Sequence, residues 1–230
     1  ATARRWRGAR PRSARATRVE LDVAFTVHGF APDPTRARRA VCFEKQGPGA
    51  CEVDLLAPRV VRPLAATAGR AFYGHGVFGR DGAALYAVET DLRTGVGAVV
   101  VRDGASLAVL GEFPTYGHNP HDCVAIDGGA ALLITNGGGA LDGPAPCVTT
   151  VDVASQRLLD TKPIPDLRWN AGHVAMSADG AVVVVSAPRD GRPRGDLGGV
   201  SIGTRATPLL LVPDPVDVVR RLTGESLSVA

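Results

Sequence analysis

A short pattern recurs along this chain: a histidine, an aspartate a few residues later, and then an apolar run rich in β-forming residues. The four histidines are His28, His75, His121 and His173, which lie 47, 46 and 52 residues apart. A supersecondary unit that repeats at this period is typical of propeller blades. The pattern therefore predicts an all-β propeller of about four four-stranded blades, which could be part of a larger, seven-bladed ring.

Turn signals and apolar runs divide the chain further. They predict a single propeller domain over residues 19–230, with blades at roughly 28–66, 73–115, 121–165 and 173–212. Val19 to Phe25 alternates weakly and could form a strand that pairs with the far end of the ring. Asp214-Pro215, followed by apolar residues three apart, predicts a short helix over 214–223.

The positive charge is concentrated at one end. Seven arginines lie between Arg4 and Arg18, so the rest of the chain carries a net charge of −4. Residues 1–18 are expected to be an irregular tail, and no nucleic-acid-binding motif accompanies them. We expect no nucleic-acid partner and a monomeric protein. No apolar run reaches 18 residues, so no transmembrane segment is expected.

Cysteines bear on the compartment. Cys42 and Cys51 flank Gln46-Gly47-Pro48-Gly49, a turn signal, so on a hairpin they could face each other at bridging distance. Such a disulfide would indicate an oxidising compartment, whereas the alternative is two small buried side chains. Cys123 and Cys147 lack metal-type spacing and are expected in the core.

The repeated histidines have two interpretations. Each imidazole could hydrogen-bond within its own blade, as in the propellers whose repeats open with Gly-His. Alternatively, pseudosymmetry brings all of them to one mouth of the channel, where they would bind an anion or a transition-metal ion such as iron, copper or zinc.

Further candidate ligands stand near two of the histidines. His118 precedes His121 by three residues on an expected turn, and the adjoining Asp122 could orient a ligand from behind. Glu89 and Asp91, at the end of the strand after His75, could add oxygen ligands or form a solvated strand end. The triglycine after Asn136 matches no phosphate-binding fingerprint, and no Gly-x-Ser-x-Gly motif is present.

A set of short motifs runs through the chain: His28-Gly29-Phe30-Ala31-x-Asp33-Pro34, Phe72 to Phe78, Glu89-x-Asp91, Gly95-x-Gly97, Gly111 to Pro114, Gly117-x-x-Pro120-His121, Asn136-Gly137-Gly138 and Ser228-Val229-Ala230. Over roughly residues 27–230 they resemble a bacterial family catalogued as domain of unknown function 1513. The resemblance implies a propeller exported to the periplasm, often by the twin-arginine route, and frequently encoded beside iron-uptake genes. It implies no known reaction.

Three departures lead us to expect an incomplete member of that family. The tail before Val19 differs from the family's opening blade, the segment after Gly139 is shorter, and the blades expected after Ala230 are missing. An export signal is also absent from this chain, so the expected periplasmic location presupposes its removal.

These observations favour a non-enzymatic periplasmic propeller that binds a metal ion, a metal-bearing ligand or a partner protein at the histidine-lined mouth, with a link to iron uptake. Asp122, Glu112 and Asn136 are the residues expected to contact a ligand. One alternative is a metal-dependent lactonase or oxidoreductase on the same ring, in which the metal polarises a substrate oxygen. The other is a structural scaffold, because fold alone does not select a function.

Overall fold

The computed structural model describes residues 20–177, 179–189 and 200–212, and its regular elements are almost entirely strands. In chain order these are β1 (Val27–Pro32), β2 (Arg39–Glu44), β3 (Gly49–Asp54), β4 (Arg59–Ala65), β5 (Arg70–Phe78), β6 (Ala84–Asp91), β7 (Val96–Asp103), β8 (Val109–His118), β9 (Pro120–Ile126), β10 (Ala131–Asn136), β11 (Cys147–Asp152), β12 (Leu158–Pro163), β13 (Val174–Met176), β14 (Ala181–Val185), β15 (Val200–Thr204) and β16 (Leu210–Val212). A single 3-10 turn, η1 (Asp127–Gly129), follows β9.

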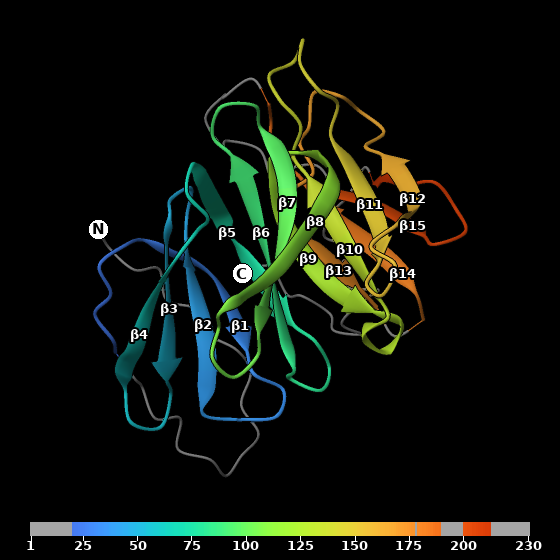
Figure 1. Cartoon of the computed structure of the whole chain (residues 1–230). Helices are drawn as coiled ribbons and strands as arrows, with labels where there is room; N and C mark the ends of the chain where they lie inside the picture. Colours follow the sequence, from blue (N-terminus) through green and yellow to red (C-terminus); the bar gives the residue numbers. More distant parts are fainter. Residues whose placement is uncertain (1–19, 178, 190–199, 213–230) are drawn as a thin grey trace, which may run out of the picture.

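The strands form four antiparallel sheets, each built from four consecutive strands. We call them blade 1 (β1–β4), blade 2 (β5–β8), blade 3 (β9–β12) and blade 4 (β13–β16). The first strands lie next to one another, β1 beside β5, β5 beside β9 and β9 beside β13, while β4 and β12 lie toward the outside (Figure 1). The prediction of an all-β propeller with four four-stranded blades is confirmed. The predicted Arg-rich tail and C-terminal helix fall outside the described residues.

The middle strands are continuous apolar runs because both of their faces are buried. In β10, every residue is buried. Successive side chains of a strand point to opposite faces, so Leu132 and Ile134 pack with blade 2, whereas Leu133 packs with blade 4. Strand β10 therefore belongs to two cores at once.

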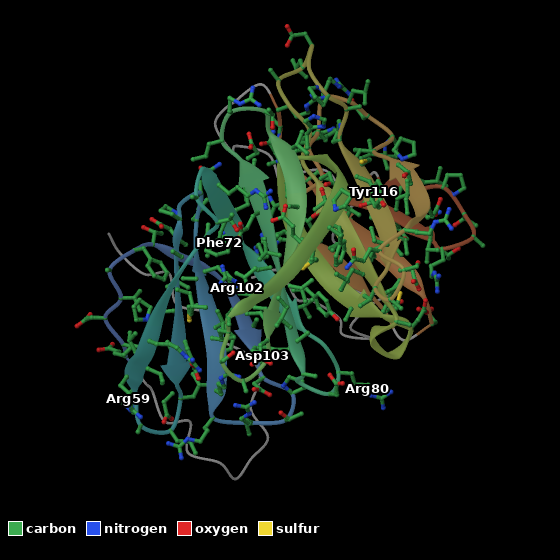
Figure 2. All side chains as sticks on the ribbon, in the orientation of Figure 1. Arg59, Phe72, Arg80, Arg102, Asp103 and Tyr116 are labelled. Carbon is green, nitrogen blue, oxygen red and sulfur yellow. The ribbon has the colours of Figure 1, made fainter. Side chains whose placement is uncertain are left out.

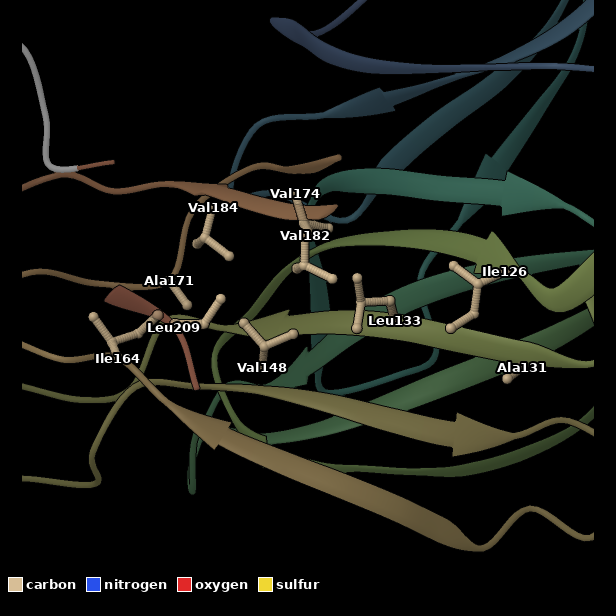
Figure 3. Close-up of a cluster of buried hydrophobic side chains, with 10 residues drawn as sticks. All are labelled: Ile126, Ala131, Leu133, Val148, Ile164, Ala171, Val174, Val182, Val184 and Leu209. Atoms are coloured by element: carbon tan, nitrogen blue, oxygen red, sulfur yellow. The ribbon is translucent and has the colours of Figure 1, made fainter. Parts of the chain in front are cut away.

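Each interface between neighbouring blades has its own apolar core. Between blades 1 and 2, the rings of Phe43 and Phe72 meet edge to face with centroids 5.3 Å apart. Arg102 of β7 (labelled with Phe72 in Figure 2) donates a 2.6 Å hydrogen bond to the carbonyl of Ala65, which ties the two blades together. Between blades 3 and 4, Leu133 and Val148 pack against Val182 and other aliphatic side chains (Figure 3).

The outer face of blade 1 is covered by the segment that precedes it. Leu21, Val23 and Phe25 pack on Cys42 and Cys51. The weak alternation of this segment is thus real, but its described part, residues 20–26, forms no strand. For these residues the expectation of a strand that pairs with the far end of the ring is wrong, because their apolar side chains pack on the outer face of blade 1 instead.

No helix among the described residues is long and apolar enough to cross a membrane. The first strands of the blades, which meet at the centre, carry the repeated histidines or directly follow them.

Candidate metal centre

The four repeated histidines meet at one point. His28 lies on β1, His75 on β5, His121 on β9, and His173 directly before β13. One ring nitrogen from each can be chosen so that all of these atoms lie within 4.8 Å of one another. The ring centroids are between 4.7 and 5.5 Å apart for every pair. Of the described histidine, cysteine and acidic side chains, these four histidines form the group that could hold a metal ion.

Two glycines allow this close approach. A Cβ on Gly29 would lie 1.8 Å from the carbonyl oxygen of Gly74, and a Cβ on Gly74 would lie 2.6 Å from the Cβ of His28. Gly74 also has a φ of 126°, which favours glycine. The His-Gly and Gly-His pairs of the sequence therefore bring the backbones of β1 and β5 together so that His28 and His75 can meet.

Asp122 holds two of the rings from behind. Its Oδ1 lies 3.4 Å from His75 Nδ1, and its Oδ2 lies 3.5 Å from His173 Nδ1. The carboxylate also accepts hydrogen bonds from the backbone N–H groups of Cys123 at 2.8 Å and Val174 at 3.2 Å. With the proton on Nδ1 facing Asp122, the lone pair of each imidazole is on Nε2. A carboxylate behind a metal-ligating histidine fixes its tautomer in this way.

The arrangement of the ring nitrogens suits a metal ion. Nε2 of His75 is buried and has no hydrogen-bond partner. Buried polar atoms without a partner are rare in native structures. Nε2 of His28 and Nε2 of His121 lie 3.3 Å apart. Two nitrogens bound to one metal ion at about 2.0–2.1 Å with a tetrahedral angle are about 3.3–3.4 Å apart, so the donor set fits such an ion.

The rings of His28, His75 and His121 are uncharged at neutral pH. Burial, with smaller effects of His75 and His173, lowers the pKa of His28 to about 4. Burial, followed by the other three imidazoles, lowers the pKa of His121 to about 3. The pKa of His75 is also lowered, chiefly by burial. Burial by itself raises the pKa of Asp122, but the contacts with His173 and His75 outweigh it and the pKa is lowered overall. Neutral imidazoles beside an ionised carboxylate are the state that binds a metal cation.

The four histidines differ in their exposure to solvent. His121 is 9% exposed, whereas the side chain of His173 is 48% exposed. The cluster is therefore most exposed to solvent at His173, next to blade 4.

Tyr73 is a neighbour that the sequence did not indicate. Its ring lies 4.3 Å from that of His121 and 6.5 Å from that of His28, measured between centroids. Because Tyr73 stands in only one of the repeats, the periodicity gave no signal for it. Its closeness in sequence to His75 was the available hint.

The structure does not bring the other predicted metal ligands to the cluster. His118 ends β8 of blade 2, opposite Val96, and only Asn119 separates it from β9. Asn119 has a φ of 49°. The expected turn at the mouth is therefore one residue long, and His118 and His121 belong to different blades.

The two acidic candidates are engaged elsewhere. Glu89 is fully buried in β6, where it accepts a 3.0 Å hydrogen bond from the N–H of Thr67 and lies 3.5 Å from Arg102. Asp91 closes the turn between β6 and β7 by accepting hydrogen bonds from the N–H groups of Arg93 and Thr94. Both carboxylates therefore stabilise the connections of blade 2.

The remaining predicted contacts are also spread out. Glu112 forms an exposed, two-pronged ion pair with Arg70, at 2.7 and 2.8 Å. Asn136 is fully buried at the end of β10, where its Nδ2 donates to Thr149 Oγ1 at 3.1 Å. Of the three residues expected to contact a ligand, the structure places Asp122 alone at the histidine cluster.

The fold and this site together define a β-propeller with a four-histidine cluster at its centre. The model of the family described as "Protein of unknown function (DUF1513)" matches residues 21–143, which is more than half of the chain. The chain belongs to this family, in agreement with the resemblance of its motifs. No curated protein matches it.

Two solved structures show the same fold at low sequence identity. The Cps50 (Swd1) β-propeller domain of Myceliophteria thermophila has a TM-score of 0.63 at 15% identity, covering 86% of this chain and 62% of that one. Hydrazine synthase of Kuenenia stuttgartiensis has a TM-score of 0.51 at 15% identity, covering 87% of this chain and 69% of that one. The chain therefore spans about two thirds of the length of these structures. At such identity the likeness shows the propeller fold alone.

Proposed function

We propose that this protein binds one transition-metal ion through His28, His75, His121 and His173. The observation that carries the proposal is the buried, unpartnered Nε2 of His75, in a cluster whose ring nitrogens lie within 4.8 Å of one another. A purely structural histidine would find a hydrogen-bond partner inside its blade. Here the tautomer set by Asp122 leaves Nε2 free for an ion.

The donor set narrows the choice of ion. Imidazole suits zinc, copper, iron and nickel, whereas calcium and magnesium prefer oxygen ligands. Asp122 offers its oxygens to the ring N–H groups of His75 and His173, so it orients them and leaves four nitrogens as the donors. Among divalent ions, copper binds most tightly to almost any nitrogen site, so affinity alone does not select the ion. The supply of each metal in the cell therefore helps to decide which ion is bound.

The test is metal analysis of the protein purified without chelator or affinity metal, followed by titration of the metal-free protein with zinc, copper and ferrous ions. One equivalent is expected to bind to the wild type and to be lost in the His75→Ala/His121→Ala double variant. His118→Ala is the matched control, because this histidine lies outside the cluster and should leave binding unchanged.

Because the double variant could fail to fold, a single substitution provides a second test. His173 is the most exposed member of the cluster, so His173→Ala should keep the circular dichroism spectrum and weaken binding at least tenfold. Failure of every ion to bind the wild type would refute the proposal. Equal loss in His118→Ala would show that the ion binds elsewhere.

For the compartment, we propose the periplasm, with iron as the ion to test first, following the family resemblance. The positions of Cys42 and Cys51 support the periplasm, because the two residues lie directly opposite each other on β2 and β3 and could form a disulfide in an oxidising compartment. In the structure both side chains are buried and both thiols are free. Protein extracted from the periplasm with a thiol-blocking reagent should show two fewer free thiols than the reduced protein. Four free thiols in such a sample would refute the disulfide.

A further inference from the structure

A cavity of about 480 Å³ adjoins the histidine cluster. It is lined by the first strands of blades 1, 2 and 3, with apolar walls that include Phe30, Val77 and Val124. His75 and Asp122 line it at the cluster, and Arg80 lines it beyond the other end of β5. Pockets of about 300–1,000 Å³ with mostly apolar walls and a few polar groups are typical of small-molecule sites.

Two charged residues line the cavity, Asp122 and Arg80, and they differ in whether other groups of the described chain pair with them. The Asp122 carboxylate accepts from two backbone N–H groups and faces two imidazoles. Arg80, in the loop after β5 (Figure 2), forms no ion pair or hydrogen bond with the described part of the chain. By contrast, Arg39 and Arg70 are paired with acidic side chains. Within the described residues, Arg80 therefore places an exposed and unpaired cation at this end of the cavity.

The distance between the two ends limits the length of a ligand. His75 and Phe78 are three residues apart in an extended strand, which corresponds to about 10 Å, and Arg80 follows within about 17 Å of His75 at most. Gly128 and Gly129, in η1 after β9, also line this end. Their missing side chains leave the Arg80 end accessible.

We propose that the cavity binds an elongated organic anion, with a carboxylate held by Arg80, an apolar chain along Phe30, Val77 and Val124, and an oxygen or nitrogen donor that binds the metal as a ligand in addition to the four histidines. The donor end rests on the proposed metal site. The carboxylate end and the apolar chain depend only on the protein. Arg80 and the cluster thus recognise opposite ends of one molecule.

The first arm of the test uses metal-free protein and isothermal titration calorimetry with octanoate and its uncharged analogue octanamide. Octanoate should bind at least tenfold more tightly than octanamide, and Arg80→Gln should remove this preference. Arg93→Gln is the matched control, because Arg93 is exposed and lies outside the cavity. Equal binding of the two probes, or an unchanged preference in Arg80→Gln, would overturn the carboxylate end of the proposal.

The second arm uses the monohydroxamate of suberic acid, which carries a carboxylate at one end and a metal-chelating hydroxamate at the other. On protein loaded with nickel or copper, it should bind at least tenfold more tightly than octanoate and change the visible spectrum of the ion. This gain should disappear in the metal-free protein and in His75→Ala/His121→Ala. A gain that persists without metal would overturn the donor end.

The two proposals fail in different ways. If no metal binds to the wild type, the proposed function fails, while the octanoate preference on metal-free protein still decides the Arg80 site. If metal binds but neither probe distinguishes Arg80→Gln from Arg93→Gln, the metal site stands and the cavity proposal is overturned.

Discussion

His28 and His121 bring their Nε2 atoms to within 3.3 Å of each other although 93 residues separate them in the chain. They belong to blades 1 and 3, which are not neighbours in the ring. An ion shared by these rings would join blades that otherwise touch mainly through blade 2. Metal binding should therefore stabilise the whole fold as well as the site.

The first prediction follows from this linkage. An ion present at 100 times its dissociation constant should raise the free energy of unfolding by about 2.7 kcal/mol. For a domain of this size, that corresponds to a rise in Tm of about 5–11 °C. Thermal denaturation of the metal-free protein with and without zinc measures the effect, and addition of a chelator should reverse it.

Magnesium is the control for this experiment, because it prefers oxygen ligands and should leave Tm unchanged. An equal rise in Tm in the His75→Ala/His121→Ala variant would contradict the assignment of the effect to the cluster.

The second prediction concerns Asp122. Replacement by Asn removes the charge that holds the Nδ1 protons of His75 and His173, so both rings lose their fixed tautomer. Loss of such a partner typically costs 10–100-fold in metal affinity, and we expect a decrease of about this size with stoichiometry kept. The affinity is measured by competition with a chromogenic chelator.

Asp91→Asn serves as its comparison. Asp91 was predicted as a ligand from the sequence, but it accepts hydrogen bonds within a turn of blade 2. Its substitution should leave the metal affinity unchanged. An equal decrease in both variants would show that charge alone, and not orientation of the rings, controls the affinity.

The third prediction concerns Tyr73, whose ring packs on His121 at 4.3 Å. Packed aromatic pairs contribute about 0.5–1.5 kcal/mol, so Tyr73→Leu should weaken metal binding by roughly two- to tenfold through a less well held His121. Tyr73→Phe keeps the ring and should restore binding to the wild-type level. If Phe is as weak as Leu, the hydroxyl group and not the ring is responsible.

The site was predictable from the sequence to the extent that it follows the repeat. His28, His75, His121 and His173 occupy equivalent positions of equivalent units, so symmetry alone brings them together. The same argument identified the blades, because the middle strands of a propeller are buried on both faces and show as apolar runs such as Ala131 to Thr135.

The other predicted ligands were chosen because they are close in sequence to the repeated histidines. Residues that are close in sequence can belong to different blades, and their side chains then need not meet. His118 ends β8 and His121 lies on β9, and the single left-handed residue Asn119 connects these strands of two different blades. Glu89 accepts a hydrogen bond from Thr67, in the connection between blades 1 and 2. Tyr73 and the cavity beside Arg80 depend on packing between blades, which periodicity does not encode.

The fourth prediction concerns Gly74, where an added Cβ would lie 2.6 Å from the Cβ of His28. Its φ of 126° also disfavours any other residue. We expect Gly74→Ala to lower the free energy of unfolding by about 2–4 kcal/mol through strain and overpacking, and to displace His28 so that metal affinity falls as well.

Gly111→Ala is the matched control. Nothing lies within 4 Å of a Cβ added there, and Gly111 sits in β8, away from the cluster. Urea denaturation should show little change for this variant. A similar loss of stability in both variants would mean that flexibility of the strands, and not the approach of β1 to β5, is what the glycine provides.

The last prediction concerns Asp33, which is buried beside Arg39 in blade 1. Its Oδ2 lies 3.1 Å from Arg39 Nη1, and its Oδ1 accepts hydrogen bonds from the N–H and hydroxyl groups of Thr35. Burial by itself raises the pKa of Asp33, but the hydrogen bonds from Thr35 and Arg39 outweigh it, so the pKa is lowered overall. Replacement by Asn leaves Arg39 without this partner and should cost about 3 kcal/mol at neutral pH.

The sign of the pH dependence follows from linkage. The folded protein holds the ionised carboxylate more strongly than the unfolded chain, whose aspartate has a pKa of about 3.9. The stabilisation by Asp33 is therefore fully present above that value and is lost as the pH falls through the lower folded value. Urea denaturation between pH 7 and pH 3 should show a difference in the free energy of unfolding between wild type and Asp33→Asn that is constant at first and shrinks below about pH 4.

Asp142→Asn, at an exposed position, should show no such difference at any pH. A difference that stays constant down to pH 3 would mean that Asp33 acts through its shape and hydrogen bonds, and not through its charge.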